Sequence, residues 1–335
     1  MPTVTADDIA GVTAAVARRW RAIDPLLPAP GAPAGGCGAE LAVTDPDGQL
    51  AAIGTCEHWR DAPGSLELTW GAASRFRLTV QAAGPDIAGA LDQLLARWHT
   101  HLAAVPEAAA DDTAAVVTWP SRDVGGPLPL LRHGLAPRAV IAARPAGRRA
   151  AVQNGTQPGG PVDGGALPAP RRGVQIRRAG PADLGAVVRL GMETIRFDAH
   201  FGTVIERPWS AEALRRETEP LLAGPGAWTW LAEHDGEPAG LLYAEPPAAA
   251  GWIAPMTGPA PVAYLELMYV PPGKRGQGAA PALVDHLHRE ADTAGVAVTL
   301  LHYEQVNPLS GPFWSRQGYR PLWTSWEARP ARTLR

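Results

Sequence analysis

At 335 residues, 46% of them hydrophobic, the chain is long enough for two domains of ordinary size and can bury a sizeable core. Its formal net charge of -3 gives no bulk attraction to nucleic acid or to anionic membranes, so neither is an expected partner. Cys37 and Cys56 match no metal-ligand or C-x-x-C spacing, the histidines show no ligand spacing, and the start, MPTVTADDIAGV, has neither a basic stretch nor an apolar signal core. We therefore expect a cytoplasmic protein with free thiols and no metal.

The first half of the chain contains a predicted hairpin and a helix. Residues Glu40 to Thr55 read ELAVTDPDGQLAAIGT, which is two apolar runs around an Asp-Gly pair, and that pair favours a tight turn between antiparallel strands. A further segment, Leu78 to Gly89, precedes a predicted helix that continues from Leu91.

A composition change marks a domain boundary. Residues 145–172 read PAGRRAAVQNGTQPGGPVDGGALPAPRR, and a run of Gly, Pro and polar residues buries too little apolar surface to offset the entropy of ordering. An ordered excursion along the surface is the alternative to a mobile linker. The sequence thus predicts one domain over residues 1–145, a linker over 146–172 and a second domain over 173–335.

The second half contains a strand, a glycine-rich turn and a helix in direct succession. Val262 to Val270 has the apolar composition of a buried strand, and Ala279 to Ala294 has its apolar residues at helical spacing. Gly276 and Gly278 lie between them, and glycine allows a ligand to approach the backbone closely. Amide N–H groups at a helix N-terminus bind anions, and Arg275 adds a cation, so the turn indicates a phosphate site.

A second motif follows at a suitable distance. Val296 to Tyr303 indicates another strand, Asn307 comes four residues later, and the segment Phe313 to Tyr319 reads FWSRQGY. The order of these motifs, together with Arg275-x-x-Gly278-x-Ala280, resembles the GNAT superfamily of acyl-CoA-dependent N-acyltransferases. The likeness covers the C-terminal half, from Val174 to about Pro330.

This resemblance implies an α/β fold with a mixed sheet and an acyl-CoA, such as acetyl-CoA, as co-substrate. The first strand would be Val174 to Arg178, and the first two helices would be Pro181 to Arg196 and Ser210 to Leu222. The hairpin of Trp228 to His234 and Pro238 to Glu245 has the Asp-Gly turn that such hairpins favour. The residues expected to contact the cofactor are Met268, Tyr269, Val270, Arg275, Gly276, Gln277, Gly278, Ala279, Ala280, Asn307 and Phe313. Asn307 could equally be a helix-starting cap.

The first half resembles a degenerate copy of the second, which indicates tandem GNAT folds. Its ELAVTDPDGQLAAIGT hairpin parallels WLAEHDGEPAGLLY at residues 230–243, and LLRHGLAP at 130–137 parallels FWSRQGYRP at 313–321. At the position of the phosphate turn, however, Leu78 to Gly89 has no arginine and no Gly-x-Gly, and Asp86 lies where a phosphate would approach. We therefore expect the first domain not to bind CoA.

Acyl transfer to an amine needs a base, a polarised carbonyl and an acid for the leaving thiolate. In the family, the carbonyl lies where the motif strand parts from the next strand, so the donor here would be a backbone N–H of Met268, Tyr269 or Val270. Glu266 is the expected base, because a carboxylate in an apolar strand is costly without a role, although a structural ion pair is the alternative. Alternation places it on one face with Met268 and Val270.

Two further candidates for proton transfer, His302 and Tyr303, lie at the end of the following strand, and one of them is expected to be a core residue. Trp314 departs from the family, because many relatives have there the tyrosine that protonates the thiolate. Tyr303, Tyr319 or solvent would then take that role.

In the family the acceptor is bound by the first two helices and the loop between them, here Met192 to Trp209. The residues expected to contact it are Phe197, Asp198, Phe201 and Trp252. Trp252 belongs to Pro246 to Pro261, a Pro-, Ala- and Gly-rich loop that either covers the acceptor site or is a passive surface excursion.

Three functions remain open: acetylation of a primary amine on a small molecule, acetylation of a peptide or protein amine with the first domain as docking surface, and non-catalytic acyl-CoA binding by a regulator. A fold does not determine the acceptor. The oligomeric state is left open.

Overall fold

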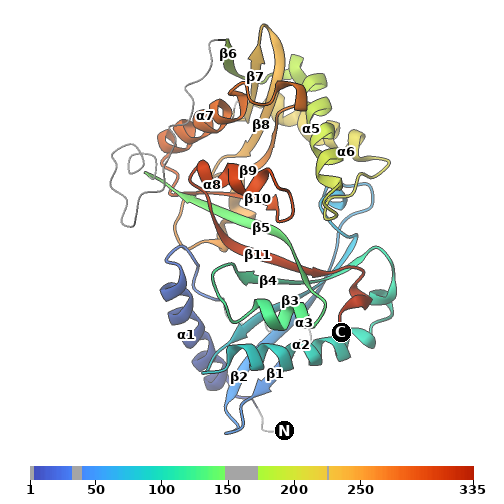
Figure 1. Ribbon diagram of the computed structural model, residues 1–335, viewed down its shortest axis with the longest axis vertical. Helices are drawn as coiled ribbons and strands as arrows, with labels where there is room; N and C mark the ends of the chain where they lie inside the picture. Colours follow the sequence, from blue (N-terminus) through green and yellow to red (C-terminus); the bar gives the residue numbers. More distant parts are fainter. Residues whose placement is uncertain (1–3, 32–39, 148–172, 225) are drawn as a thin grey trace. The chain divides into compact units, whose positions relative to one another are not determined.

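The computed structural model describes residues 4–31, 40–147, 173–224 and 226–335 (Figure 1). It divides into two compact units. Unit 1 consists of Met1–Pro63, Trp70–Ile141 and Pro321–Arg335, and unit 2 consists of Gly64–Thr69 and Ala142–Arg320. Cys37 and all but the first two residues of the predicted linker lie outside the described residues. No helix in the described part of the chain is long and apolar enough to cross a bilayer.

Unit 1 is a mixed sheet with helices. Its strand order is β1-β2-β3-β4-β11-β5, in which β1, β2 and β3 are antiparallel neighbours and β3 and β4 are parallel. The helix α2 forms the crossover between the two parallel strands, as such a pair requires. The elements are α1 (Ala6–Ile23), β1 (Glu40–Thr44), β2 (Leu50–Arg60), β3 (Ser74–Ala82), α2 (Ile87–Ala103), β4 (Thr113–Pro120), α3 (Pro127–Arg132), β5 (Ala136–Pro145) and β11 (Arg320–Ala328).

Unit 2 repeats this arrangement. Its strand order is β5-β10-β9-β8-β7-β6, with β6 to β9 antiparallel and β9 and β10 parallel around the crossover helix α7. Figure 1 shows α5 and α6 on one side of β7 and β8, and α7 on the other. The elements are β6 (Val174–Arg178), α5 (Leu184–Ala199), α6 (Ser210–Ala223), β7 (Trp228–His234), β8 (Glu237–Glu245), β9 (Val262–Tyr269), α7 (Ala279–Thr293), β10 (Val298–Glu304) and α8 (Ser310–Arg316). The predicted α/β class with a mixed sheet is confirmed.

The two halves of the sequence exchange their last strands. β11, from the end of the chain, pairs with β4 of unit 1, with Trp323 opposite Pro120 and Ala328 opposite Ala115. In turn β5 ends in unit 2 beside β10, where the backbone N–H of Ala146 donates to the carbonyl of Ala297 at 2.8 Å. The core of unit 1 accordingly includes Trp326 and Leu334. Neither half of the sequence therefore contains all the strands of one unit.

Close packing in unit 2 depends on two glycines. A Cβ atom on Gly240 of β8 would lie 3.2 Å from the side chain of Leu283, so β8 and α7 approach closely there. A Cβ atom on Gly191 would lie only 2.7 Å from the side chain of Leu214, which brings α5 against α6. The first contact packs α7 against β8, and the second packs the two helices α5 and α6 against each other.

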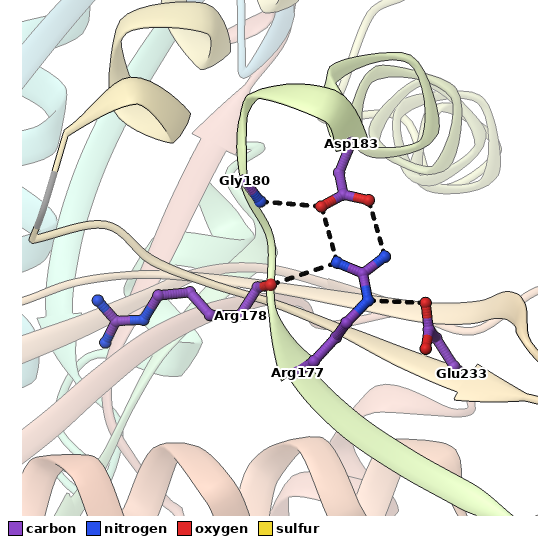
Figure 2. A network of polar contacts seen from close by, with 5 residues as sticks. All are labelled: Arg177, Arg178, Gly180, Asp183 and Glu233. Carbon is purple, nitrogen blue, oxygen red and sulfur yellow. Dashed lines mark hydrogen bonds and ion pairs between the residues drawn. The ribbon is translucent and has the colours of Figure 1, made fainter.

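A polar network fixes the start of α5 (Figure 2). The Arg177 guanidinium donates to both carboxylate oxygens of Asp183, at 2.7 and 2.8 Å, and its Nε donates to Glu233 at 2.7 Å. Asp183 also accepts the backbone N–H of Gly180 at 2.9 Å. The hydrogen bond to Arg177 is the main reason that the pKa of Asp183 is lowered. The network joins β6, α5 and β7 and has a structural role.

Candidate active site

The strands β9 and β10 separate within unit 2. Their parallel register runs from Val262 opposite Val298 to Leu265 opposite Leu301, although β9 continues to Tyr269 and β10 to Glu304. Because successive residues of a strand direct their N–H groups to opposite edges, part of β9 beyond Leu265 presents amide donors to this gap. The resemblance described above led us to expect an opening between the motif strand and the next strand.

The glycine-rich turn lies after the end of β9 and contains two glycines with positive φ. Gly276 and Gly278 have φ angles of 74° and 92°, the left-handed region that glycine adopts readily, and Gly278 is the N-cap of α7. Among the described residues, the backbone N–H groups of Gly276, Gln277 and Gly278 have no hydrogen-bond acceptor. Ala279 and Ala280 begin α7, so their N–H groups add to the positive end of the helix dipole.

Arg275 is held at the same turn. Its Nε donates to the carbonyl of Val270 at 3.0 Å, and its guanidinium carbon lies 4.9 Å from the ring centre of Phe197. The ring of Tyr269 lies 6.0 Å away. The cation is therefore fixed by β9 on one side and by α5 on the other, while the side chain remains exposed.

A β-bulge isolates Glu266. In the pairing of β8 with β9, Tyr243 lies opposite Leu267 and Ala244 lies opposite Leu265, so Glu266 has no residue opposite it. The bulge interrupts the simple alternation on which the sequence prediction relied, and such an extra residue redirects its side chain. Burial raises the pKa values of Tyr243 and Tyr264, and the Glu266 charge adds to both increases, so the carboxylate lies near both phenols.

Glu266 has the electrostatics of a base that operates near neutral pH. Burial raises its pKa to about 8, and the negative charges of Glu245, Glu217 and Glu67 contribute to the increase. Among the described residues its side chain forms no ion pair and no hydrogen bond. The structural ion pair considered for this residue is therefore not found in the described part of the chain.

His302 belongs to an aromatic group beside Glu266. Its Nδ1 lies 2.9 Å from the hydroxyl of Tyr264, and its ring stacks at 6.5 Å, with an interplanar angle of 8°, on Trp252. The indole nitrogen of Trp252 donates to Glu245 at 2.7 Å. Although solvent reaches the imidazole, desolvation lowers its pKa to about 4. His302 is therefore neutral at physiological pH and is a weak base.

Tyr303 is the phenol at the end of the gap. Its hydroxyl would lie 3.9 Å from a Cβ atom on Gly311, so it lies against the first turn of α8, and burial raises its pKa. Tyr319 is only 3% exposed and its hydroxyl lies 3.2 Å from Nε2 of His288 in the packing around α7. Trp314 is also buried, against the Tyr319 ring. Tyr303 is therefore partly buried, whereas Tyr319 and Trp314 are buried.

Asn307 forms a local turn before α8. Its Oδ1 accepts the backbone N–H of Leu309 at 3.0 Å, but the N-cap of α8 is Leu309, so Asn307 is not the helix-starting cap that the sequence allowed. Phe313 is partly buried on α8 and contacts Trp314 with ring centres 4.9 Å apart. Gln277 donates to the carbonyl of Gly273 at 3.3 Å, which tightens the turn.

The predicted acceptor residues fall into two separate groups. Phe197 and Phe201 contact each other with ring centres 5.4 Å apart, and Phe197 lies next to Arg275 and Tyr269, on the side of the glycine-rich turn. The charge of Asp198 acts on Tyr269, so Asp198 lies in the same group. Burial raises the pKa of Asp198 to about 6. Trp252 instead joins Tyr264 and His302.

Sequence reasoning missed several residues near Glu266. They are Tyr264 of β9, Tyr243 and Glu245 of β8, Glu217 of α6 and Glu67 of the segment Gly64–Thr69. Alternation along β8 could have indicated Tyr243 and Glu245 together, because residues two apart share a face. No local signal in the sequence connects Glu67 with residues nearly two hundred positions away.

Unit 1 has a different structure at the position of the glycine-rich turn. The Oδ1 of Asp86 accepts the backbone N–H of Gly89 at 2.8 Å, so a carboxylate caps the N-terminus of α2. A Cβ atom on Gly89 would lie 2.2 Å from the other carboxylate oxygen, which is a measure of how closely the carboxylate covers this turn. A phosphate approaching here would meet a negative charge.

Comparison with known proteins identifies a family over part of the chain. The family model described as Acetyltransferase (GNAT) family matches residues 193–319. A solved GCN5-related N-acetyltransferase from Sphaerobacter thermophilus matches 98% of this chain and 94% of its own, with 16% identity and a TM-score of 0.53. This likeness extends the fold over the full length.

Weaker structural matches were also found. A GNAT-family acetyltransferase from Colwellia psychrerythraea is 12% identical, covering 97% of each chain with a TM-score of 0.48. An N-acetyltransferase from Thermoplasma acidophilum, solved in complex with coenzyme A, is 14% identical with a TM-score of 0.34, covering 47% of this chain and 98% of its own. No curated protein matches the sequence.

Proposed function

Because residues 193–319 belong to the acetyltransferase (GNAT) family, we propose that this chain transfers an acetyl group from acetyl-CoA to a primary amine of a small molecule. The combination of two neighbouring features carries the proposal. The strands β9 and β10 separate after Leu265 and Leu301, and the turn that follows β9 has backbone N–H groups without a hydrogen-bond acceptor among the described residues. An extended ligand with a phosphate end and a thioester end suits this combination.

The turn supports cofactor binding. The N–H groups of residues 276–280 would bind the pyrophosphate, with the helix dipole of α7 behind them and Arg275 as fixed cation. Acetyl-CoA supplies an acetyl thioester whose carbonyl carbon is open to attack. A backbone N–H of Met268, Tyr269 or Val270 at the gap would donate to the carbonyl oxygen and stabilise its developing negative charge.

Glu266 would act as the general base, directly or through a water molecule. With a pKa of about 8 it can take the proton of the attacking ammonium group, whose nitrogen then forms the bond to the carbonyl carbon. As the carbon–sulfur bond breaks, the Tyr303 phenol, whose pKa is raised, would give its proton to the thiolate. His302 would orient Tyr264 and leave proton transfer to the carboxylate.

The first half of the chain would have a supporting role. Asp86 on the N-terminus of α2 argues against a second CoA site. We place the enzyme in the cytoplasm, with a cofactor-binding domain in the second half of the sequence and a degenerate repeat in the first.

Two measurements test the proposal. Titration calorimetry with acetyl-CoA should give one binding event per chain. Mass spectrometry of a primary-amine library, incubated with the protein and acetyl-CoA, should reveal an acceptor heavier by one acetyl group. Failure of acetyl-CoA to bind at any concentration up to the millimolar range would contradict the proposal.

A further inference from the structure

We infer that the acceptor is a short aliphatic amine with a hydroxyl group at its far end, and that a pocket beside Glu266 binds this end. This inference rests on the proposed acetyl transfer, because it assigns a substrate class to the same site. The pocket, which we call the threonine pocket, lies in unit 2 between the helices α5 and α6 and the strands β7 to β9. Its wall includes Gly191, Leu214, Thr218, Thr229, Tyr243 and Leu267.

The threonine pocket adjoins the bulge of β9. Tyr243 and Leu267, both in its wall, lie opposite each other in the pairing of β8 with β9. Glu266 is the bulged residue directly before Leu267, and its charge acts on the Tyr243 phenol. Because both wall residues are neighbours of Glu266, an amine bound at this carboxylate would reach the pocket with a short chain.

Two threonines in the wall are buried without a hydrogen-bond partner among the described residues. Thr218 and Thr229 are only 7% and 2% exposed, and neither hydroxyl bonds to any part of the chain that the structure describes. Thr194 on α5 shows the usual alternative, since its hydroxyl donates to the carbonyl of Leu190 at 3.0 Å. A buried hydroxyl without a partner destabilises the folded chain, so we expect a polar group in the pocket to bond these two.

The size and apolar wall of the pocket favour a narrow, neutral chain. Leu214 and Leu267 are buried, so they stabilise methylene groups and disfavour a charged end that would lose its water there. The volume of the pocket is about 30 Å³. One water molecule needs roughly 10–15 Å³, so there is room for about two non-hydrogen atoms, such as those of a hydroxymethyl group, but not for a ring.

An alcohol matches the two threonines in its hydrogen bonding. Its hydroxyl can accept a hydrogen bond from one threonine and donate one to the other. A methyl group in its place would leave both Thr218 and Thr229 unpaired, and an ammonium group would be moved from water into an apolar wall. The pocket therefore distinguishes an amino alcohol from an alkylamine and from a diamine of the same length.

The test compares amines that differ only in their last group. 4-Amino-1-butanol, n-pentylamine and 1,4-diaminobutane have equal numbers of non-hydrogen atoms, and the same three end groups are tested on chains one carbon shorter and one carbon longer, each with saturating acetyl-CoA. For at least one chain length, kcat/KM of the alcohol should exceed that of the alkylamine and of the diamine about tenfold or more. Acetylation in which the alcohol is no better than its two partners at every length would overturn the inference.

Variants test the two threonines directly. Thr229→Val keeps the shape of the side chain and removes its hydroxyl, so the preference for the alcohol over the alkylamine should fall about tenfold, with acetyl-CoA affinity unchanged. T218V should act in the same direction. The control is T55V, the same change at a strand threonine of unit 1 that is 5% exposed. The ratio of two kcat/KM values on one sample does not depend on the folded fraction, and an unchanged ratio in both T229V and T218V would contradict the role of the pocket.

A second variant fills the pocket instead of changing its polarity. The Cβ atom of G191A would lie 2.7 Å from the flexible end of Leu214, so the added methyl group and the displaced leucine should take up space in the pocket. We expect kcat/KM for the preferred amino alcohol to fall about tenfold in G191A, with acetyl-CoA affinity unchanged. Unchanged kinetics in G191A would show that the acceptor does not enter the pocket.

Binding without turnover distinguishes this inference from the proposed function. Saturation-transfer NMR of the same amines with the full chain should show stronger contact for the alcohol than for the alkylamine, and T229V should remove the difference. If this preference is found but no acetyl transfer occurs, the catalytic proposal fails and the pocket assignment stands. Acetyl transfer to amines without any preference for the alcohol removes this inference alone, and the absence of both binding and transfer removes both.

Discussion

Nδ1 of His302 lies 2.9 Å from the hydroxyl of Tyr264, a residue two positions before the bulged Glu266. The bond joins the two diverging strands at the start of the gap. Desolvation holds the pKa of the imidazole at about 4, whereas it raises that of the carboxylate to about 8. The same loss of water thus weakens one candidate base and strengthens the other, because it disfavours the charged form of each.

The first prediction concerns proton transfer. Replacing Glu266 by Gln keeps the shape and removes the proton acceptor, so kcat should fall about 100-fold with little change in acetyl-CoA affinity. A base acts when deprotonated, so kcat/KM of the wild type should rise with pH through an apparent pKa near 8. In E266Q this rise of kcat/KM with pH should be absent. H302A should lower kcat less than E266Q does. A large loss of kcat in H302A, together with an unchanged kcat in E266Q, would assign the general base to His302 on β10.

Arg275 provides the second prediction. R275E reverses a charge beside the proposed pyrophosphate site and should weaken acetyl-CoA binding at least about tenfold, or about 1.4 kcal/mol. R289E, the same change at an exposed position of α7 far from its N-terminus, is the control. Calorimetry of the wild type should give one site per chain, because Asp86 caps the corresponding helix of unit 1. Two sites, or equal weakening by both variants, would refute this assignment.

The third prediction uses Lys274, the single lysine of the sequence, which lies in the turn before Arg275. An amine-reactive N-hydroxysuccinimide ester should label Lys274 and the chain's α-amino group. Acetyl-CoA at ten times its Kd should slow labelling of Lys274 about tenfold, in proportion to occupancy, and leave the α-amino group unaffected. Peptide mass spectrometry measures both rates in one sample. Equal protection of the two amines, or of neither, would place the cofactor elsewhere.

The last prediction follows from the exchange of final strands. A fragment of residues 174–335 lacks the strand β5, which pairs with β10 and whose end from Ala142 onward belongs to unit 2, and it lacks the segment Gly64–Thr69 of the same unit. It should expose a sheet edge and aggregate. By contrast, the full chain cut at a protease site inserted between residues 148 and 172 should remain one particle in gel filtration and keep its activity. A soluble, monomeric and fully active fragment would contradict this expectation.

Local pattern in the sequence determined much of this protein. The apolar run from Val262, the Gly276 and Gly278 pair and the helical spacing after Ala279 are short-range features, so strand, turn and helix were predictable close to their observed bounds. The glycines have positive φ, which their residue type permits at low cost. The acidic residue on the corresponding helix of the first half, Asp86, was predictable in the same way.

Only the tertiary structure decided the surroundings of Glu266. A bulge depends on the pairing of two strands, and the charges on Glu266 come from β8, α6 and a segment almost two hundred residues earlier. Likewise, β11 pairs with β4 across more than two hundred residues. Hydrogen bonding and desolvation depend on neighbours in space, so they cannot be predicted from the periodicity of residues along the chain. The sequence therefore indicated the cofactor turn, whereas the fold brought together the groups proposed to select and deprotonate the amine.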